Sequence, residues 1–151
     1  MKLYRREQYL KKIRPFYDDD IIKVITGIRR CGKSSLMETV MEELRERGVP
    51  DKDIVYLDLE KRGNRSIKTP DQLEAAIERR LADDGFKYLF IDEVQNVEGY
   101  EEVVNAYNAD GGFSTFITGS NSYLLSGELM TKLTGRYVEF EMFPLSFAEY
   151  L

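Results

Sequence analysis

Runs of apolar residues alternate along this chain with segments whose apolar residues recur every three or four positions. Short apolar runs predict buried strands, and the helical spacing predicts helices that pack on one face. Strands are predicted at residues 21–26, 54–59, 88–94, 114–118 and 137–143. Strands that alternate with helices imply right-handed crossovers and a parallel sheet covered on both faces. The pattern therefore predicts an α/β fold.

Helices are predicted between these strands and ahead of the first one. The clearest start is at residues 69–72, TPDQ, because threonine, proline and glutamine at these positions are typical of a capping box. Gly48 predicts the end of the helix after the first strand, since glycine readily adopts the left-handed conformation found there. The other predicted helical segments are residues 1–16, 69–82, 100–107 and 123–133.

The turn between the first strand and its helix carries a phosphate-binding pattern. Residues 27–34, GIRRCGKS, match G-x-x-x-x-G-K-[ST] at every position. In this pattern backbone amides surround a phosphate, Lys33 reaches the β- and γ-phosphates, and the Ser34 hydroxyl binds Mg²⁺. The residues expected to bind the nucleotide are Gly27, Arg30, Cys31, Gly32, Lys33, Ser34 and Ser35. The alternatives are a chance match, a solvated Arg30 and a Cys31 that only fills space.

Two carboxylates follow the apolar run at residues 88–91. Ligands of a parallel sheet bind at the carboxyl ends of its strands, which is where Asp92 and Glu93 are expected. Asp92 is suited to hold Mg²⁺ and its water shell, and Glu93 is suited to polarise an attacking water as general base. The alternative is an exposed strand end with ordinary acidic residues.

Later positions supply further candidates for catalysis. Ser120 and Asn121, after the fourth apolar run, are expected either to sense the γ-phosphate and orient the water or to cap a helix. Arg136, before the fifth predicted strand, is expected to stabilise transition-state charge, with a structural ion pair as the alternative.

Composition narrows the chemistry and the compartment. The 151 residues fit one domain, and histidine is absent, which removes the commonest general base. Cys31 is the only cysteine, so no internal disulfide can form and a cytoplasmic location is expected. The net charge of −5 gives no overall attraction to nucleic acid or to an anionic membrane. No apolar run is long enough to span a bilayer, so no membrane association is expected.

Together these segments resemble prokaryotic AAA-type P-loop ATPase domains that are usually fused to a C-terminal, nuclease-like domain. The stretches that carry the resemblance are GIRRCGKSSLM, LFIDEVQNV, FITGSNSYLLSGELMTKLTGR and FPLSFAEYL. The resemblance implies a three-layer α/β/α sandwich, a P-loop NTPase fold whose parallel sheet has the order 5-1-4-3-2. It also implies ATP with Mg²⁺ and, often, an arginine used between copies of an oligomer. Its motif positions match at Gly32, Lys33, Ser34, Asp92 and Glu93.

Members of that family continue beyond FPLSFAEYL into a helical lid and a second domain. Residues 1–151 are therefore expected to be the N-terminal AAA-type ATP-binding fragment of a longer protein. Within it, residues 1–20 form a helical segment and residues 21–143 form the P-loop core.

The leading hypothesis is an ATPase that uses ATP and Mg²⁺ to drive a conformational change in an attached effector domain, releasing ADP. The alternative is an ATP-dependent switch or interaction module with little or no hydrolysis. A homo-oligomer and a nucleic-acid partner are left open. A GTPase is disfavoured because no N-K-x-D stretch is present, and a kinase is disfavoured because paired carboxylates suit water activation.

Overall fold

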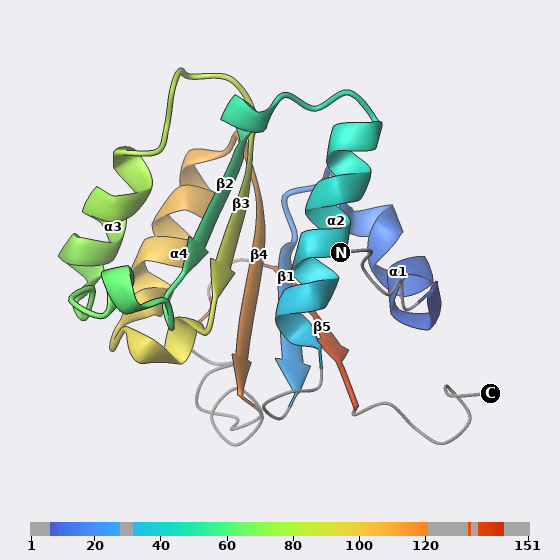
Figure 1. Cartoon of the computed structure of the whole chain (residues 1–151). Coiled ribbons are helices and arrows are strands. Elements are labelled where there is room, and N and C mark those ends of the chain that lie inside the picture. The colour runs from blue at the N-terminus through green and yellow to red at the C-terminus, as the bar shows by residue number, and fades with distance from the viewer. Residues whose placement is uncertain (1–6, 28–31, 121–132, 134–135, 144–151) are drawn as a thin grey trace.

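A five-stranded parallel sheet forms the middle of the molecule. The computed structural model describes residues 7–27, 32–120, 133 and 136–143. The strands are β1 (Ile22–Gly27), β2 (Ile54–Asp58), β3 (Lys87–Asp92), β4 (Phe113–Ser120) and β5 (Tyr137–Glu141). They lie in the order β2-β3-β4-β1-β5, and each neighbouring pair runs parallel (Figure 1). Read from the other edge, this is the predicted order 5-1-4-3-2, which is confirmed.

Helices cover both faces of this sheet. The α-helices of the described residues are α1 (Glu7–Ile13), α2 (Lys33–Glu46), α3 (Pro70–Glu78) and α4 (Tyr100–Asp110). Short 3₁₀ turns are η1 (Arg14–Phe16), η2 (Asp51–Asp53), η3 (Arg62–Asn64) and η4 (Val94–Asn96). Helices α3 and α4 lie on one face, and α1 and α2 lie on the other (Figure 1). The predicted three-layer α/β/α sandwich is confirmed.

Each face of the sheet has its own apolar core, as expected for strands buried on both sides. The core under α3 and α4 includes Val24, Leu57, Leu73, Ile77, Leu89, Ile91, Val103, Val104 and Ile117. The core under α1 and α2 includes Leu10, Ile13, Ile25, Leu36, Met37, Val40, Leu44, Phe90 and Phe116. The rings of Phe90 and Phe116 stack with centroids 4.5 Å apart. This contact ties β3 to β4 two residues before Asp92 on β3 and Thr118 on β4.

Three helices differ in their bounds from those predicted. Helix α4, predicted over residues 100–107, continues to Asp110, just before Gly111. The first helix, predicted over residues 1–16, is α-helical from Glu7 to Ile13 in the described residues. It tightens into η1 because Pro15 has no backbone N–H to continue the α-helical ladder. Helix α3 begins at the predicted capping box but ends at Glu78 instead of residue 82. There Leu81 N donates to Glu78 O in a tighter turn, which brings Leu81 back against the core.

The strand bounds shift by at most two residues, because hydrogen-bonded pairing sets them instead of apolar character alone. Strand β4 extends to Ser120, which pairs with Gly27 at the end of β1. Strand β5 ends at Glu141, two residues before the predicted limit. The helix predicted at residues 123–133 lies outside the described residues, apart from Leu133. No helix in the described ranges is long and apolar enough to cross a membrane.

Candidate nucleotide-binding site

The carboxyl ends of β1, β3 and β4 meet at one edge of the sheet. Gly27, the last residue of β1, pairs with Ser120, the last residue of β4. Ile91 pairs with Ile117, so Asp92 and Thr118 come next at the same level of the two strands. Helix α2 begins here, directly after Gly32, whose φ of 96° lies in the left-handed region that suits glycine. Polar side chains from separate segments therefore converge at this edge.

Lys33 opens helix α2 and its side chain is buried against the end of β1. The ammonium Nζ donates to Gly27 O at 2.8 Å and lies 3.5 Å from Glu93 Oε1. Only 4% of the Lys33 side chain is exposed. The buried ammonium thus lies beside the N-terminus of α2, where backbone N–H groups also point. Both features favour the binding of an anionic group.

Three hydroxyl groups donate to the carboxylate of Asp92, which is almost fully buried. Ser34 donates to Oδ2 at 2.5 Å, and Tyr56 donates to the same oxygen at 2.9 Å. Thr118 donates to the other oxygen, Oδ1. Burial, and after it the charge of Asp92, raises the pKa of Tyr56 above its ordinary value, so the phenol stays a donor. The carboxylate is thus held in one orientation beside Ser34.

Glu93 has a backbone conformation that is unusual for a residue with a side chain. Its φ of 59° and ψ of 56° lie in the left-handed region. The Glu93 N–H donates to Thr118 Oγ1 at 2.9 Å, and Gln95 Nε2 donates to Glu93 Oε2 at 2.6 Å. Such strain persists where surrounding contacts enforce it, and it is concentrated at functional sites. Here the contacts hold the Glu93 carboxylate toward Lys33.

A pocket of about 290 Å³ lies in front of these groups and is lined by Gly32, Lys33, Ser34, Ser35 and Glu93. Its lining combines the start of α2, an ammonium, two hydroxyls and a carboxylate. In the described residues no group of three or more His, Cys, Asp or Glu side chains is arranged to hold a metal ion. This donor set fits Mg²⁺ bound through one carboxylate, one hydroxyl and the phosphates of a nucleotide, and it does not fit a dedicated protein cage.

The structure brings together most of the residues predicted for the site. Gly27, Gly32, Lys33, Ser34, Ser35, Asp92, Glu93 and Ser120 all lie at the carboxyl edge of the sheet. Arg30, Cys31 and Asn121 lie outside the described residues. Arg136 lies at the opposite end of the sheet, where β1 and β5 begin, and its carbonyl accepts from Ile22 N at 2.9 Å. Its Nη2 lies 3.6 Å from Asp20 Oδ1, and both side chains are exposed. Arg136 is therefore remote from Lys33 of its own chain.

Three residues at the site were not predicted from sequence. Thr118 bridges Asp92 and the Glu93 backbone, Tyr56 binds Asp92, and Gln95 binds Glu93. Thr118 lies on the same strand as the predicted residue Ser120, two positions before it. The alternation of β2 could have indicated that Tyr56 shares a face with Asp58. Gln95 had no sequence signal beyond its closeness to Glu93.

This fold and site define a P-loop NTPase of the AAA type. The family model described as "AAA domain" matches residues 19–151. The chain belongs to this family.

A relative and two solved structures show how far the similarity extends. An uncharacterized protein of Haemophilus influenzae is 42% identical over 147 residues, which is 97% of this chain and 37% of that protein. The chain thus spans well under half of that relative's length. The structure of C. elegans PCH-2 has a TM-score of 0.65 at 14% identity, covering 98% of this chain and 46% of that one. The Aeropyrum pernix ORC2 protein, solved as ADPNP–ADP complexes, has a TM-score of 0.54 at 10% identity, covering 89% and 45%. At such identities the two structures bear on the fold alone.

Proposed function

We propose that this domain binds ATP with Mg²⁺ and hydrolyses it to ADP. The observation that carries the proposal is the pocket lined by Lys33 and Ser34, at the start of α2, and by Glu93, directly after β3. The hydroxyl of Ser34 is also bonded to Asp92, the last residue of β3. Phosphate affinity then comes from the backbone N–H groups at the start of α2 together with the Lys33 ammonium. Ser34 and Asp92 are the groups that would hold Mg²⁺, which supplies neutralisation of phosphate charge.

Glu93 is the proposed general base. Its carboxylate faces the pocket, and Thr118 and Gln95 fix its backbone and side chain, respectively. A fixed carboxylate can accept a proton from a water positioned in line with the γ-phosphate. Ser120, at the end of β4, and Asn121 remain candidates for sensing the γ-phosphate. The Glu93 arrangement favours hydrolysis over the alternative, a switch that binds ATP without turnover.

The work done by the ATP cycle is proposed to involve parts of the protein beyond this chain. The Haemophilus relative is more than twice as long as the matched region, so an attached C-terminal effector domain of nuclease-like type is part of the proposal. We also propose association between copies of the chain and a cytoplasmic location. Arg136 enters this scheme as a residue that acts on a neighbouring copy.

Calorimetric titration with ATP, ADP and GTP in the presence of Mg²⁺ tests the binding site. Wild type is expected to bind ATP and ADP, and Lys33→Ala is expected to lose most of the ATP affinity because the buried ammonium is gone. Lys11→Ala, which removes an exposed lysine of α1, is the matched control and should bind as wild type does. Unchanged affinity in Lys33→Ala would contradict the phosphate-site assignment.

Single-turnover hydrolysis separates the ATPase from the switch. Glu93→Gln is expected to bind ATP normally and to hydrolyse it roughly 10²-fold or more slowly, which is the usual contribution of a general base. Equal rates for wild type and Glu93→Gln would remove Glu93 from catalysis and favour the switch.

A further inference from the structure

The loop between β2 and α3 carries four basic side chains in eight positions. They are Lys61, Arg62, Arg65 and Lys68, and all four are exposed. Within the part of the chain that the structure describes, none of the four side chains makes a hydrogen bond or an ion pair. The whole chain has a net charge of −5, whereas residues 61–68 carry four positive charges and no negative one. Other exposed cations of the described residues, such as Arg45 and Lys52, do form ion pairs with carboxylates.

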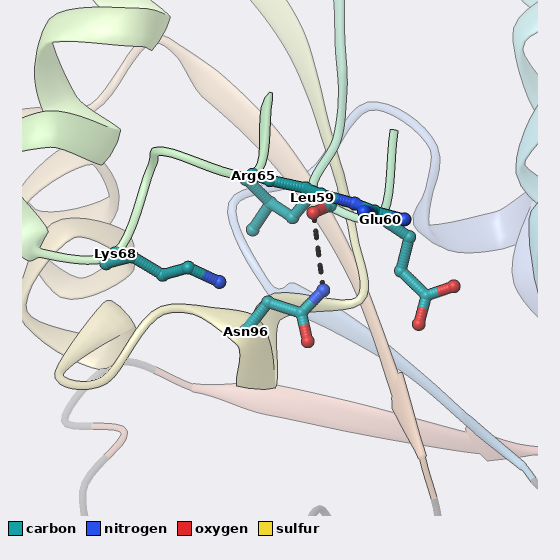
Figure 2. Close-up of a pocket in the computed structure, with 5 residues that line it drawn as sticks. All are labelled: Leu59, Glu60, Arg65, Lys68 and Asn96. Carbon is teal, nitrogen blue, oxygen red and sulfur yellow. Dashed lines mark hydrogen bonds between the residues drawn. The ribbon is translucent and has the colours of Figure 1, made fainter. Parts of the chain in front are cut away.

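Two of these cations line a pocket of about 390 Å³ at the carboxyl end of β2. The pocket is lined by Leu59, Glu60, Arg65, Lys68 and Asn96. Lys68 points across it toward Asn96, and Arg65 extends over Leu59 (Figure 2). The carboxylate of Glu60 points away from Lys68 (Figure 2). An anion above Asn96 would therefore meet the ammonium of Lys68 without facing a carboxylate on that side.

The loop is held in place by its own contacts. Asn64 Nδ2 donates to Asp58 O at 2.8 Å, and Asn96 Nδ2 donates to Leu59 O at 3.3 Å (Figure 2 shows the second bond). Ile67, between the cations, is buried in the core under α3 and α4. At the end of the loop, Lys68 N donates to Gln72 Oε1 at 2.7 Å. Because the backbone is already ordered, binding an anion would lose less conformational entropy than binding by a free tail.

We propose that residues 61–68 bind the phosphate backbone of a nucleic acid. Arg65 and Lys68 would each hold one phosphate at the pocket, while Lys61 and Arg62 reach neighbouring phosphates of the same strand. A row of cations matches a row of phosphates better than it matches one small anion. None of the described residues that line the pocket has an aromatic side chain for base stacking, so the contact positions the strand without reading its sequence.

The loop is also joined to the proposed nucleotide site. Leu59 N donates to the backbone carbonyl of Asp92 at 3.1 Å, directly before the basic positions. The proposal nevertheless does not rest on ATP hydrolysis, because the four cations and their pocket exist apart from Lys33 and Glu93. Nucleic-acid binding is therefore measured without nucleotide, and it should persist in Lys33→Ala even if ATP binding is lost.

Fluorescence anisotropy with a labelled single-stranded oligonucleotide and its duplex tests the proposal across a series of salt concentrations. The variant is Arg65→Gln with Lys68→Gln. Its matched control is Lys11→Gln with Lys12→Gln, which removes the same charge from exposed positions of α1. The loop variant is expected to bind roughly tenfold more weakly, and the slope of log K against log salt should fall by about two, one for each lost phosphate contact. The control should keep the wild-type slope.

Three outcomes would overturn the proposal. One is no binding of either oligonucleotide by wild type at low salt. Another is an equal loss in the loop variant and the control, which would indicate only general charge attraction. The third is displacement of the oligonucleotide by inorganic phosphate at concentrations close to the dissociation constant of the oligonucleotide. That result would indicate a site for a small anion. Circular dichroism and urea unfolding of both variants establish that a loss of binding is not a loss of fold.

Discussion

At the scale of single residues, the site is organised around Asp92. Ser34 and Tyr56 share one oxygen of this carboxylate, and Thr118 donates to the other. A group that orients a metal-binding carboxylate affects the metal even without touching it. Tyr56 is therefore a positioning residue in the proposed mechanism, and it comes from β2, a strand outside both phosphate-site motifs.

Tyr56→Phe should raise the Mg²⁺ concentration that ATP binding requires while leaving the fold intact. Loss of the phenol removes one donor that orients Asp92, so the Mg²⁺ concentration for half-maximal ATP binding should rise roughly tenfold. Tyr88→Phe is the matched control, because the Tyr88 hydroxyl donates to Asp18 instead. The measurement is an ATP titration at stepped Mg²⁺ concentrations, and equal Mg²⁺ requirements in both variants would show that Tyr56 has no such role.

The left-handed backbone of Glu93 predicts a difference between two substitutions that both remove the carboxylate. Glycine adopts this conformation freely and alanine does not, so Glu93→Gly should be more stable than Glu93→Ala by about 1 kcal/mol. Urea unfolding of the two variants measures this. Both should lose hydrolysis. If Glu93→Ala proved as stable as Glu93→Gly, the backbone would not be strained in solution.

Residue-level prediction from sequence reached the groups that belong to a fixed motif. The spacing of Lys33 and Ser34 within the phosphate-binding pattern, and of Asp92 after an apolar strand, was sufficient to expect them close together. In the structure Lys33 and Ser34 line the pocket, and Ser34 donates to Asp92. Thr118 could not be selected over Ser120, because the choice depends on how β4 is aligned with β3. Thr118 and Ser120 lie on the same face of β4, so the hydrophobic pattern that helps to set strand alignment does not choose between them.

At the scale of elements, the start of β1 carries a buried charge. Lys23 is fully buried, and its Nζ donates to Asp19 O at 2.8 Å and to Ser114 Oγ at 2.7 Å. It also lies over the ring of Phe116, 4.8 Å from the centroid. Burial lowers the pKa of Lys23 from 10.5 to about 8, against the opposing effect of the Asp19 carboxylate. The side chain joins β1, β4 and the turn before β1.

This lowered pKa predicts how stability changes with pH. Above pH 8 the folded chain releases the Lys23 proton while the unfolded chain keeps it up to about 10.5, so the free energy of unfolding rises with pH in that window. Below pH 8 the full penalty of the buried charge remains. Relative to Lys23→Met, wild type should gain about 1.5 kcal/mol between about pH 8 and about pH 9.5.

Urea unfolding of wild type and Lys23→Met at several pH values checks this. Lys11→Met, at an exposed position of α1, is the control and should follow wild type at every pH. A difference between wild type and Lys23→Met that is constant across the window would contradict the assignment.

Element-level prediction succeeded where local chemistry decides the outcome. The capping box of α3 forms as predicted, with Thr69 accepting from Gln72 N and the Gln72 side chain accepting in return. The end of α3 was placed too late, because Leu81 continues the apolar spacing but reaches the core through a tighter turn. Apolar spacing indicates which side chains are buried and does not fix where the helical ladder stops.

At the scale of the whole molecule, Arg136 and Lys33 are separated by the length of the sheet. The six residues of β1 lie between them and span about 20 Å, well beyond the reach of an arginine side chain. The role proposed for Arg136 therefore requires a second copy of the chain. The sequence predicted that Arg136 precedes β5, but it did not predict at which end of the sheet β5 begins.

Arg136→Ala should slow hydrolysis only where copies associate. At high protein concentration the turnover number should fall by roughly 10³-fold, as for the loss of an arginine that contacts the transition state. ATP affinity should not change, and at low concentration the variant and wild type should be equal. Asp20→Ala is the control, since it removes the ion pair but keeps the guanidinium. Equal losses in both variants would assign Arg136 to structure.

The pairing of β3 with β4 has a consequence for how this domain can vary. Ile91 opposite Ile117 places Asp92 level with Thr118, and a shift of one position would turn Thr118 to the opposite face of the sheet. Exchanges of one apolar side chain for another along these strands leave that alignment alone. Adding or deleting a single codon within them changes the alignment. Homologous domains should therefore differ freely in which apolar residues these strands contain and hardly at all in the length of the strands.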